Sequence, residues 1–188
     1  MSVPQSTFTP SSGTAAAGPE QGSGFGARRG LEELQRLTSA LVRLSTIEEI
    51  GTFSSRELGE LAGAATCWMG RVTEDGAVIE TIGVYGVSES MAEEFWRLPL
   101  EADFPICHAL RAGRAQWYPD KDSLVAAFPA NEIKAREIER EAAAFIPLLV
   151  GDGSSARRVG GLSLGFHQRR VFDDDTRAFL LTLAQQCA

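Results

Sequence analysis

The chain has 188 residues, an apolar fraction of 44% and a formal net charge of −7, with a sequence pI near 4.9. This length suits one domain with a tail, and the apolar content is enough for one hydrophobic core. The acidic balance argues against nucleic acid and anionic membranes as partners, because phosphate groups bind to a basic face. No apolar run in the sequence reaches the length of a membrane span.

The N-terminal segment, residues 1–26, is rich in Ser, Gly, Pro, Ala and Thr. A segment with so few large apolar side chains cannot bury enough surface to offset the entropy lost on ordering. We therefore expect a disordered tail over residues 1–26 and one folded domain over residues 27–188.

Two helices are predicted before the first strand. Leucines at three- and four-residue steps predict an amphipathic helix over residues 31–44. Ser45-Thr46, followed by Glu48-Glu49, is typical of a helix cap and predicts a second helix that ends near Gly63.

A β-hairpin follows these helices. Residues 65–73 and 77–84 are predicted strands, and Glu74-Asp75-Gly76 is the turn between them. Because strand side chains alternate, Trp68 lies on the opposite face from its neighbours Cys67 and Met69.

Short elements are predicted in the middle of the chain. Ser88 can begin a helix that Leu98-Pro99-Leu100 ends, and residues 106–110 predict another helix that stops at Gly113. A brief strand over 115–118 precedes a helix that Asp120 caps and that ends near Phe128. The charged residues 130–142 indicate an exposed, helix-prone connector.

The last third of the chain predicts a second hairpin and a final helix. Residues 145–150 and 159–166 are apolar runs joined by a Gly/Asp/Ser cluster, which favours antiparallel pairing. Asp173-Asp174-Asp175 then opens a segment with helical spacing, since acids in a first turn match the positive end of the helix dipole. Hairpins at both ends without regular βαβ alternation favour an α+β fold.

The closing pattern resembles the end of a GAF domain, a small sensor module of bacterial signalling proteins. Pro147-Leu148, Gly161-Leu162-Ser163-Leu164 and Phe172-Asp173 occupy the places of that family's motifs. The resemblance implies a GAF/PAS-like central antiparallel sheet of five or six strands, with terminal helices on one face and loops and short helices on the other. It further implies a non-catalytic sensory domain that controls an attached effector, such as a histidine kinase or a phosphatase. A homodimer through the N- and C-terminal helices is the expected assembly.

The two sheet faces are assigned from residue size. Gly161, Ser163 and Gly165 share one face of their strand, and small residues let a helix approach closely, so we assign this face to the terminal helices. The other face then becomes the ligand pocket that the resemblance implies. The candidate pocket residues are Trp68, Phe95, Trp96, Phe104, His108, Trp117, Phe145, Pro147, Leu164 and Phe166. Alternatively, these side chains fill one another's space, and the chain is a structural dimerisation module.

The sequence does not identify the ligand. Asp103-Phe104-Pro105 resembles the Asp-Ile-Pro motif of phytochrome GAF domains, but the expected attachment positions lack a cysteine, so we do not expect covalent bilin. Residues 131–134 and Phe172-Asp173 do not reproduce the cyclic-nucleotide signature. His108, with one neighbouring cysteine and no third ligand in spacing, does not predict a metal site.

An enzymatic alternative rests on cysteine chemistry. Cys67, Cys107 and Cys187 are widely separated and indicate reduced thiols in a cytoplasmic protein. Cys107 falls near one cysteine of GAF proteins that reduce free methionine sulfoxide. The nucleophile of those enzymes is expected around residues 128–135, where this sequence has no cysteine. Because the chain stops within an unfinished amphipathic helix, we expect it to be an excerpt of a larger regulator.

Overall fold

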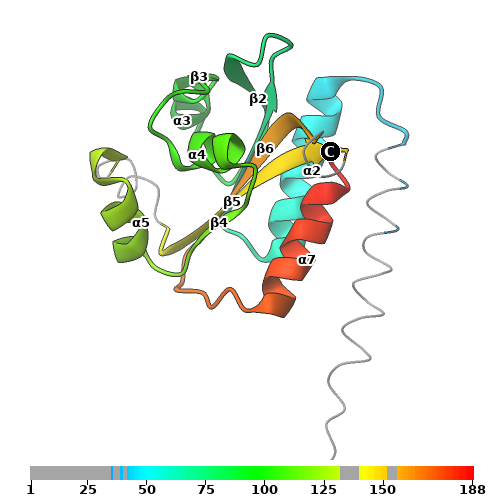
Figure 1. The fold of residues 1–188 in the computed structure, drawn as a ribbon. Coiled ribbons are helices and arrows are strands. Elements are labelled where there is room, and N and C mark those ends of the chain that lie inside the picture. The colour runs from blue at the N-terminus through cyan, green and yellow to red at the C-terminus, as the bar shows by residue number, and fades with distance from the viewer. Residues whose placement is uncertain (1–34, 36–38, 40–41, 132–139, 152–155) are drawn as a thin grey trace, which may run out of the picture.

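In the computed structural model, a six-stranded antiparallel sheet separates two layers of helices (Figure 1). The structure describes residues 42–131, 140–151 and 156–188, together with Gln35 and Ser39. The predicted tail, most of the first predicted helix and most of the charged connector lie outside these residues. The α+β fold with a central antiparallel sheet is confirmed.

The strands follow the order β3-β2-β1-β6-β5-β4 across the sheet, which places the two long hairpins side by side at its centre. The strands are β1 (Thr66–Val72), β2 (Val78–Tyr85), β3 (Arg97–Pro99), β4 (Gln116–Tyr118), β5 (Ala142–Val150) and β6 (Arg157–Phe166). The helices are α2 (Ile47–Ala62), α3 (Glu89–Glu94), α4 (Pro105–Ala112), α5 (Lys121–Ala127) and α7 (Asp174–Gln185), with a 3-10 turn at Pro129–Asn131.

Local capping chemistry sets the helix ends. Thr46 and Glu49 form a capping box at the start of α2, and Gly63 ends that helix in the left-handed conformation, with φ of 62°. Asp120 and Asp173 cap α5 and α7 by accepting a backbone N–H three residues ahead. These helix boundaries are confirmed, because each depends on groups only a few residues apart.

The edge strand β3 was not predicted from the sequence. Its three residues pair with β2 so that Leu98 lies opposite Ile79, where the sequence pattern indicated only the end of a helix. A three-residue strand is too short to show alternation, and the neighbouring β2 supplies its hydrogen bonds. Similarly, β5 begins at Ala142, three residues before the predicted strand, because alanines there pair with β6.

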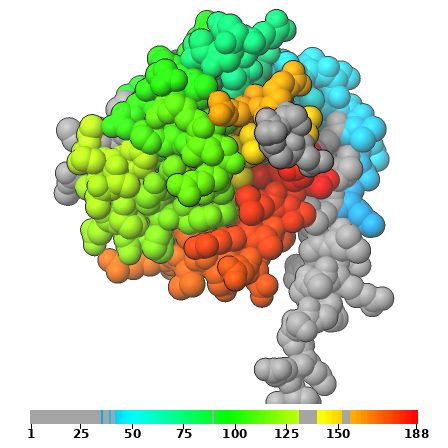
Figure 2. All heavy atoms as spheres, viewed as in Figure 1, coloured from blue at the N-terminus to red at the C-terminus, as the bar shows by residue number. Residues whose placement is uncertain are grey.

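The terminal helices α2 and α7 cover one face of the sheet, as Figure 1 shows. They enclose a core of large aliphatic and aromatic side chains between themselves and the central strands. This core includes Leu58, Met69, Ile146, Leu162, Leu164, Phe166, Phe172, Leu180 and Leu183. The opposite face is covered by α3, α4, α5 and their loops, and a space-filling view shows that helices and loops hide most of the sheet (Figure 2).

The predicted assignment of the two faces of β6 is wrong. Leu164 and Phe166 pack in the core beneath the terminal helices, whereas Gly161 and Ser163 face the middle helices. The reason is pairing register: Trp68 lies directly opposite Ser163, and directly opposed residues of an antiparallel pair share a face. The small residues of β6 therefore face the cavity and the middle helices, and not the terminal helices.

A terminal helix does approach the sheet closely at small residues, but these residues lie on α2 and β2 and not on β6. A Cβ atom on Gly51 of α2 would overlap the carbonyl oxygen of Ile82 on β2. A Cβ atom on Gly83 would overlap the backbone of Gly51 in turn. The helix backbone therefore rests directly on the backbone of β2, which only paired glycines permit.

Candidate functional site

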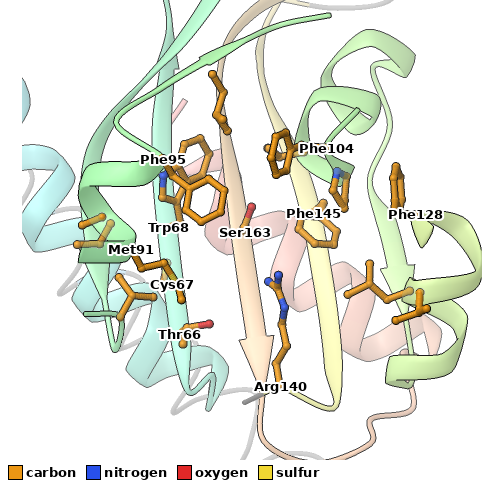
Figure 3. Close-up of a pocket in the computed structure, with 18 residues that line it drawn as sticks. Thr66, Cys67, Trp68, Met91, Phe95, Phe104, Phe128, Arg140, Phe145 and Ser163 are labelled. Carbon is orange, nitrogen blue, oxygen red and sulfur yellow. The ribbon is translucent and has the colours of Figure 1, made fainter. Parts of the chain in front are cut away.

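A cavity lies between the sheet and the layer formed by α3, α4 and α5. It measures about 90 Å³ and is lined by 18 residues, most of them apolar (Figure 3). This is space for several water molecules, and it is smaller than the roughly 150 Å³ in which a benzene ring fits. A ligand with an aromatic body would therefore extend into the open mouth of the cavity or displace part of its wall.

The floor of the cavity is one row across three neighbouring strands. Ser163 on β6 lies opposite Trp68 on β1 and opposite Phe145 on β5. Directly opposed side chains share a face, so a small hydroxymethyl group stands between two aromatic rings. The short side chain of Ser163 creates the hollow that a larger residue would fill.

Trp68 is fixed by hydrogen bonds behind the cavity. Its Nε1 donates to Thr81 Oγ1 at 2.8 Å, and the Thr81 hydroxyl donates to the carbonyl oxygen of Phe95 at 2.6 Å. The indole N–H is therefore satisfied within the protein, and the ring presents an apolar surface to the cavity. The same bonds hold the end of α3 against the sheet.

Aromatic side chains form the wall opposite the floor. Phe95 and Phe104 meet edge to face with ring centroids 5.7 Å apart, and Phe128 closes the side nearest α5. Phe104 precedes Pro105, whose fixed φ favours the first position of α4. The start of α4 thus determines where this aromatic wall stands.

Arg140, two residues before the start of β5, is the cationic residue of the lining among the described residues. Its side chain reaches into the cavity from below Ser163 in the close-up view (Figure 3). The guanidinium carbon lies 5.9 Å from the ring centroid of Phe145, within the range of a cation–π contact. Burial lowers the pKa of Arg140 to about 10.

Arg140 is not paired with an acid in the described part of the chain. Its Nε atom is buried and has no hydrogen-bond partner there. The shift in its pKa has burial as its cause and no nearby carboxylate. A partly buried arginine whose Nε atom has no partner is costly, so its position at the cavity calls for a functional explanation.

Gly165 makes room for the stem of this arginine. A Cβ atom at Gly165 would lie 3.4 Å from the Cδ atom of Arg140 and would overlap the hydroxyl of Thr66. Thr66 lies opposite Gly165 in the sheet and also lines the cavity. A larger residue at position 165 would therefore push both polar side chains out of place.

Four of the ten predicted pocket residues line the cavity: Trp68, Phe95, Phe104 and Phe145. Pro147 shares the face of Phe145, but it pairs with Gly161 in a row that α4 covers through Ile106. The role of these residues in binding stays a prediction.

The other five predicted residues lie elsewhere. Trp96 is 59% exposed, and His108 pairs with Asp103, with its Nε2 atom 2.8 Å from a carboxylate oxygen. Trp117 packs on Phe172 at a centroid distance of 5.3 Å, on the side of the terminal helices. Leu164 and Phe166 lie on that side too, because of the register described above.

Sequence reasoning missed the polar part of the lining, namely Thr66, Ser163 and Arg140. Thr66 and Ser163 follow from the alternation of β1 and β6 once the face is known. Arg140 carried no such signal, because a run of charged residues is typical of an exposed connector.

Cysteine and metal chemistry find little support in the geometry. Cys107 is buried in α4, and burial raises the pKa of its thiol to about 11, whereas a thiol nucleophile needs a lowered pKa. Among the residues with described positions, no group of three His, Cys, Asp or Glu side chains could hold a metal ion. In the same ranges, none of the helices combines the length and apolar content that crossing a bilayer requires.

Several solved structures have the same fold as this chain. A GAF domain of a phosphoenolpyruvate-protein phosphotransferase from Coxiella burnetii is 17% identical, with a TM-score of 0.69 over 86% of this chain and 91% of that one. Free methionine-R-sulfoxide reductase from Neisseria meningitidis is 18% identical, with a TM-score of 0.64 over 86% and 87% of the two chains. A methyl-accepting chemotaxis protein is 14% identical, with a TM-score of 0.64 over 80% and 92%.

At these identities the structural likeness establishes the fold alone. No curated protein sequence shows a significant match. The GAF domain family model, however, matches residues 45–188, which is most of the chain. The hairpins, the capped terminal helices and the cavity between sheet and middle helices all fall within that match. The chain therefore belongs to the GAF domain family.

Proposed function

We propose that this GAF domain is a non-catalytic sensory module that binds a small molecule between Trp68 and Phe145 and thereby regulates an attached effector. The observation that carries the proposal is the cavity above Ser163, where aromatic walls surround a few polar groups. Such a combination is the usual chemistry of small-molecule recognition. The buried thiols Cys67 and Cys107 are free, which supports a reducing, cytoplasmic setting.

The route from ligand to effector runs through a single strand. Ser163 of β6 faces the cavity, while its neighbours Leu162 and Leu164 pack beneath α2 and α7 on the other face. A ligand that favours one position of β6 would therefore favour one packing of the terminal helices. An effector joined to α7, such as a histidine kinase or a phosphatase of bacterial signalling, would receive that preference.

We further propose that the domain forms a homodimer through its terminal helices. Leu181 on α7 and Ile47 at the start of α2 are large apolar side chains of the terminal helices, and each is 43% exposed. Sedimentation analysis of the Leu181→Glu variant tests this point. A dimer that persists unchanged in the variant would place the interface elsewhere.

A structural dimerisation module with a self-filled core is the competing function. The Ser163→Val variant separates the two, because valine adds volume at the cavity floor. An open cavity accepts the valine at a cost below about 1 kcal/mol, whereas a filled interior loses about 1–3 kcal/mol through overpacking. The free energy of unfolding is measured by denaturant titration.

The same variant tests ligand binding. Mass spectrometry of small molecules that co-purify with the protein should detect a ligand in the parent chain and none in Ser163→Val. A Ser163→Ala variant keeps the space and removes only the hydroxyl, so it should retain more of the ligand than Ser163→Val. Retention of the ligand by the valine variant would contradict binding at this cavity.

A further inference from the structure

We propose that the ligand is a small monocarboxylate with an apolar body, and that the guanidinium of Arg140 binds its carboxylate inside the cavity. This inference rests on the proposed function, because it assigns the chemistry of the molecule that the cavity takes. The claim joins three observations: an unpaired cation, two hydroxyl groups beside it and an apolar wall opposite.

The cation is held in place by contacts along its stem. The Cδ atom of Arg140 runs over Gly165, and the guanidinium lies 5.9 Å from the centroid of the Phe145 ring. These contacts limit the positions open to the side chain without using its N–H donors. A guanidinium fixed in this way presents a planar fork, which matches the two oxygens of a carboxylate.

The two hydroxyl groups complete a polar corner. Thr66 and Ser163 line the cavity next to Arg140 on the same sheet face. Neither hydroxyl is hydrogen-bonded to another residue within the described ranges, and so each can donate to a ligand oxygen. Carboxylate oxygens accept several such bonds, which satisfies groups that are otherwise unpaired next to apolar walls.

Charge balance selects the kind of anion. One arginine neutralises one negative charge, and among the residues that the structure describes the lining holds no second cationic side chain. A phosphate monoester, with nearly two charges at neutral pH, would leave part of its charge unpaired beside aromatic rings. The site therefore favours a carboxylate over a phosphate.

The lining also discriminates against amino acids. It contains no Asp or Glu side chain among the residues that the structure describes, so a ligand ammonium group would find no partner. The rings of Trp68, Phe95 and Phe104 offer an apolar surface to the rest of the molecule instead. A short alkyl-carboxylate, or an aryl-carboxylate whose ring extends into the mouth of the cavity, would match both the polar corner and the apolar wall.

The test uses a set of probes that share one apolar body. Phenylacetate, phenylacetamide, phenethylamine and phenyl phosphate are each titrated into the protein, with affinity measured by calorimetry. We expect phenylacetate to bind most tightly and the Arg140→Gln variant to bind it about 10- to 100-fold more weakly, the range for hydrogen bonds to a charged group. The control variant Arg114→Gln, which removes an exposed arginine beyond the end of α4, should leave this affinity unchanged.

The probe outcomes separate the two proposals. Equal binding of phenylacetamide would overturn the carboxylate assignment while leaving the small-molecule function intact. Tighter binding of phenyl phosphate would replace the carboxylate by a phosphate. Binding of phenylacetate that is the same in Arg140→Gln and in the parent chain would overturn the role of Arg140.

A second measurement needs no ligand at all. If the role of Arg140 is ligand binding, then Arg140→Met, which retains the stem and removes the charge and the unpartnered Nε, should raise the melting temperature of the ligand-free protein. A lower melting temperature would show that the arginine stabilises the fold itself and would overturn the inference. This result stands whether or not any of the four probes binds.

Discussion

The indole of Trp68 and the hydroxyl of Thr81 are joined by a 2.8 Å hydrogen bond, and the same hydroxyl donates to the carbonyl oxygen of Phe95 at 2.6 Å. One threonine thus links the central strand β1, the strand β2 and the end of α3. Thr81 is 8% exposed, so few solvent molecules can replace these bonds. The position of the cavity wall depends on this link.

Replacing Thr81 tests the link directly. Thr81→Val keeps the shape and removes the hydroxyl, which leaves the N–H of Trp68 and the carbonyl of Phe95 without their partner. We expect a loss of about 1–3 kcal/mol in the free energy of unfolding, measured by denaturant titration. Thr81→Ser is the control and should recover most of the loss. Equal stability of the valine and serine variants would contradict a role for the hydroxyl.

A substitution on the face of β6 that packs beneath the terminal helices should lower stability without weakening ligand binding. Leu164 is 1% exposed beneath the terminal helices, so Leu164→Ala should cost about 2–5 kcal/mol of stability. The affinity of the folded variant for a cavity ligand should change little, because Leu164 does not line the cavity. Calorimetric titration at a temperature where the variant is folded measures this affinity. A specific loss of affinity without a loss of stability would return Leu164 to the pocket.

Gly51 reverses the usual effect of replacing a helical glycine. In an open helix, Gly→Ala stabilises by about 1 kcal/mol. Here the added methyl group would overlap the carbonyl oxygen of Ile82, so we expect Gly51→Ala to lower the melting temperature. Thr52→Ala, at the exposed position next along the helix, should not lower it. Stabilisation by Gly51→Ala would contradict direct contact between α2 and β2.

Cys107 should be slow to react with thiol reagents. Burial raises the pKa of its thiol to about 11, so little thiolate is present at pH 7.5. Alkylation with iodoacetamide, followed by peptide mass mapping, should modify Cys107 much faster in denaturant than in the native protein. Rapid native modification, together with methionine sulfoxide reduction that Cys107→Ser abolishes, would favour the enzymatic alternative.

Acid should weaken the start of α7 through Asp173. Hydrogen bonds from Thr176, its backbone N–H among them, hold the pKa of this carboxyl below its usual value. A folded-state pKa below the unfolded one means that the stabilisation is complete above the unfolded value near 3.9 and is lost as pH falls through the folded value.

The Asp173→Asn variant isolates this contribution. Asparagine can still cap the helix but carries no charge at any pH. The variant should therefore melt at a lower temperature than the parent chain at pH 7, and the two should converge as the pH is lowered below about 3.9. Thermal melts at several pH values measure the difference. A difference that is constant with pH would contradict a role for the charge.

The sequence by itself determined the features that arise between residues close in the chain. The cap at Ser45-Thr46, the glycine stop at Gly63 and the acid-led start of α7 were all predicted where the structure has them. These features are local because a side chain reaches a backbone group only three or four residues away. The family motifs, which combine such signals in order, indicated the fold for the same reason.

Only the tertiary structure decided which face of the sheet holds the cavity. That choice depends on the register between β1 and β6, and a shift by one residue would move every side chain of a strand to the other face. No local signal fixes the pairing of Trp68 with Ser163, since it depends on how strands distant in the sequence meet. The position of Arg140 was also decided by the tertiary structure. Its charge predicts an exposed side chain, and only the packing of distant segments places it beside the cavity.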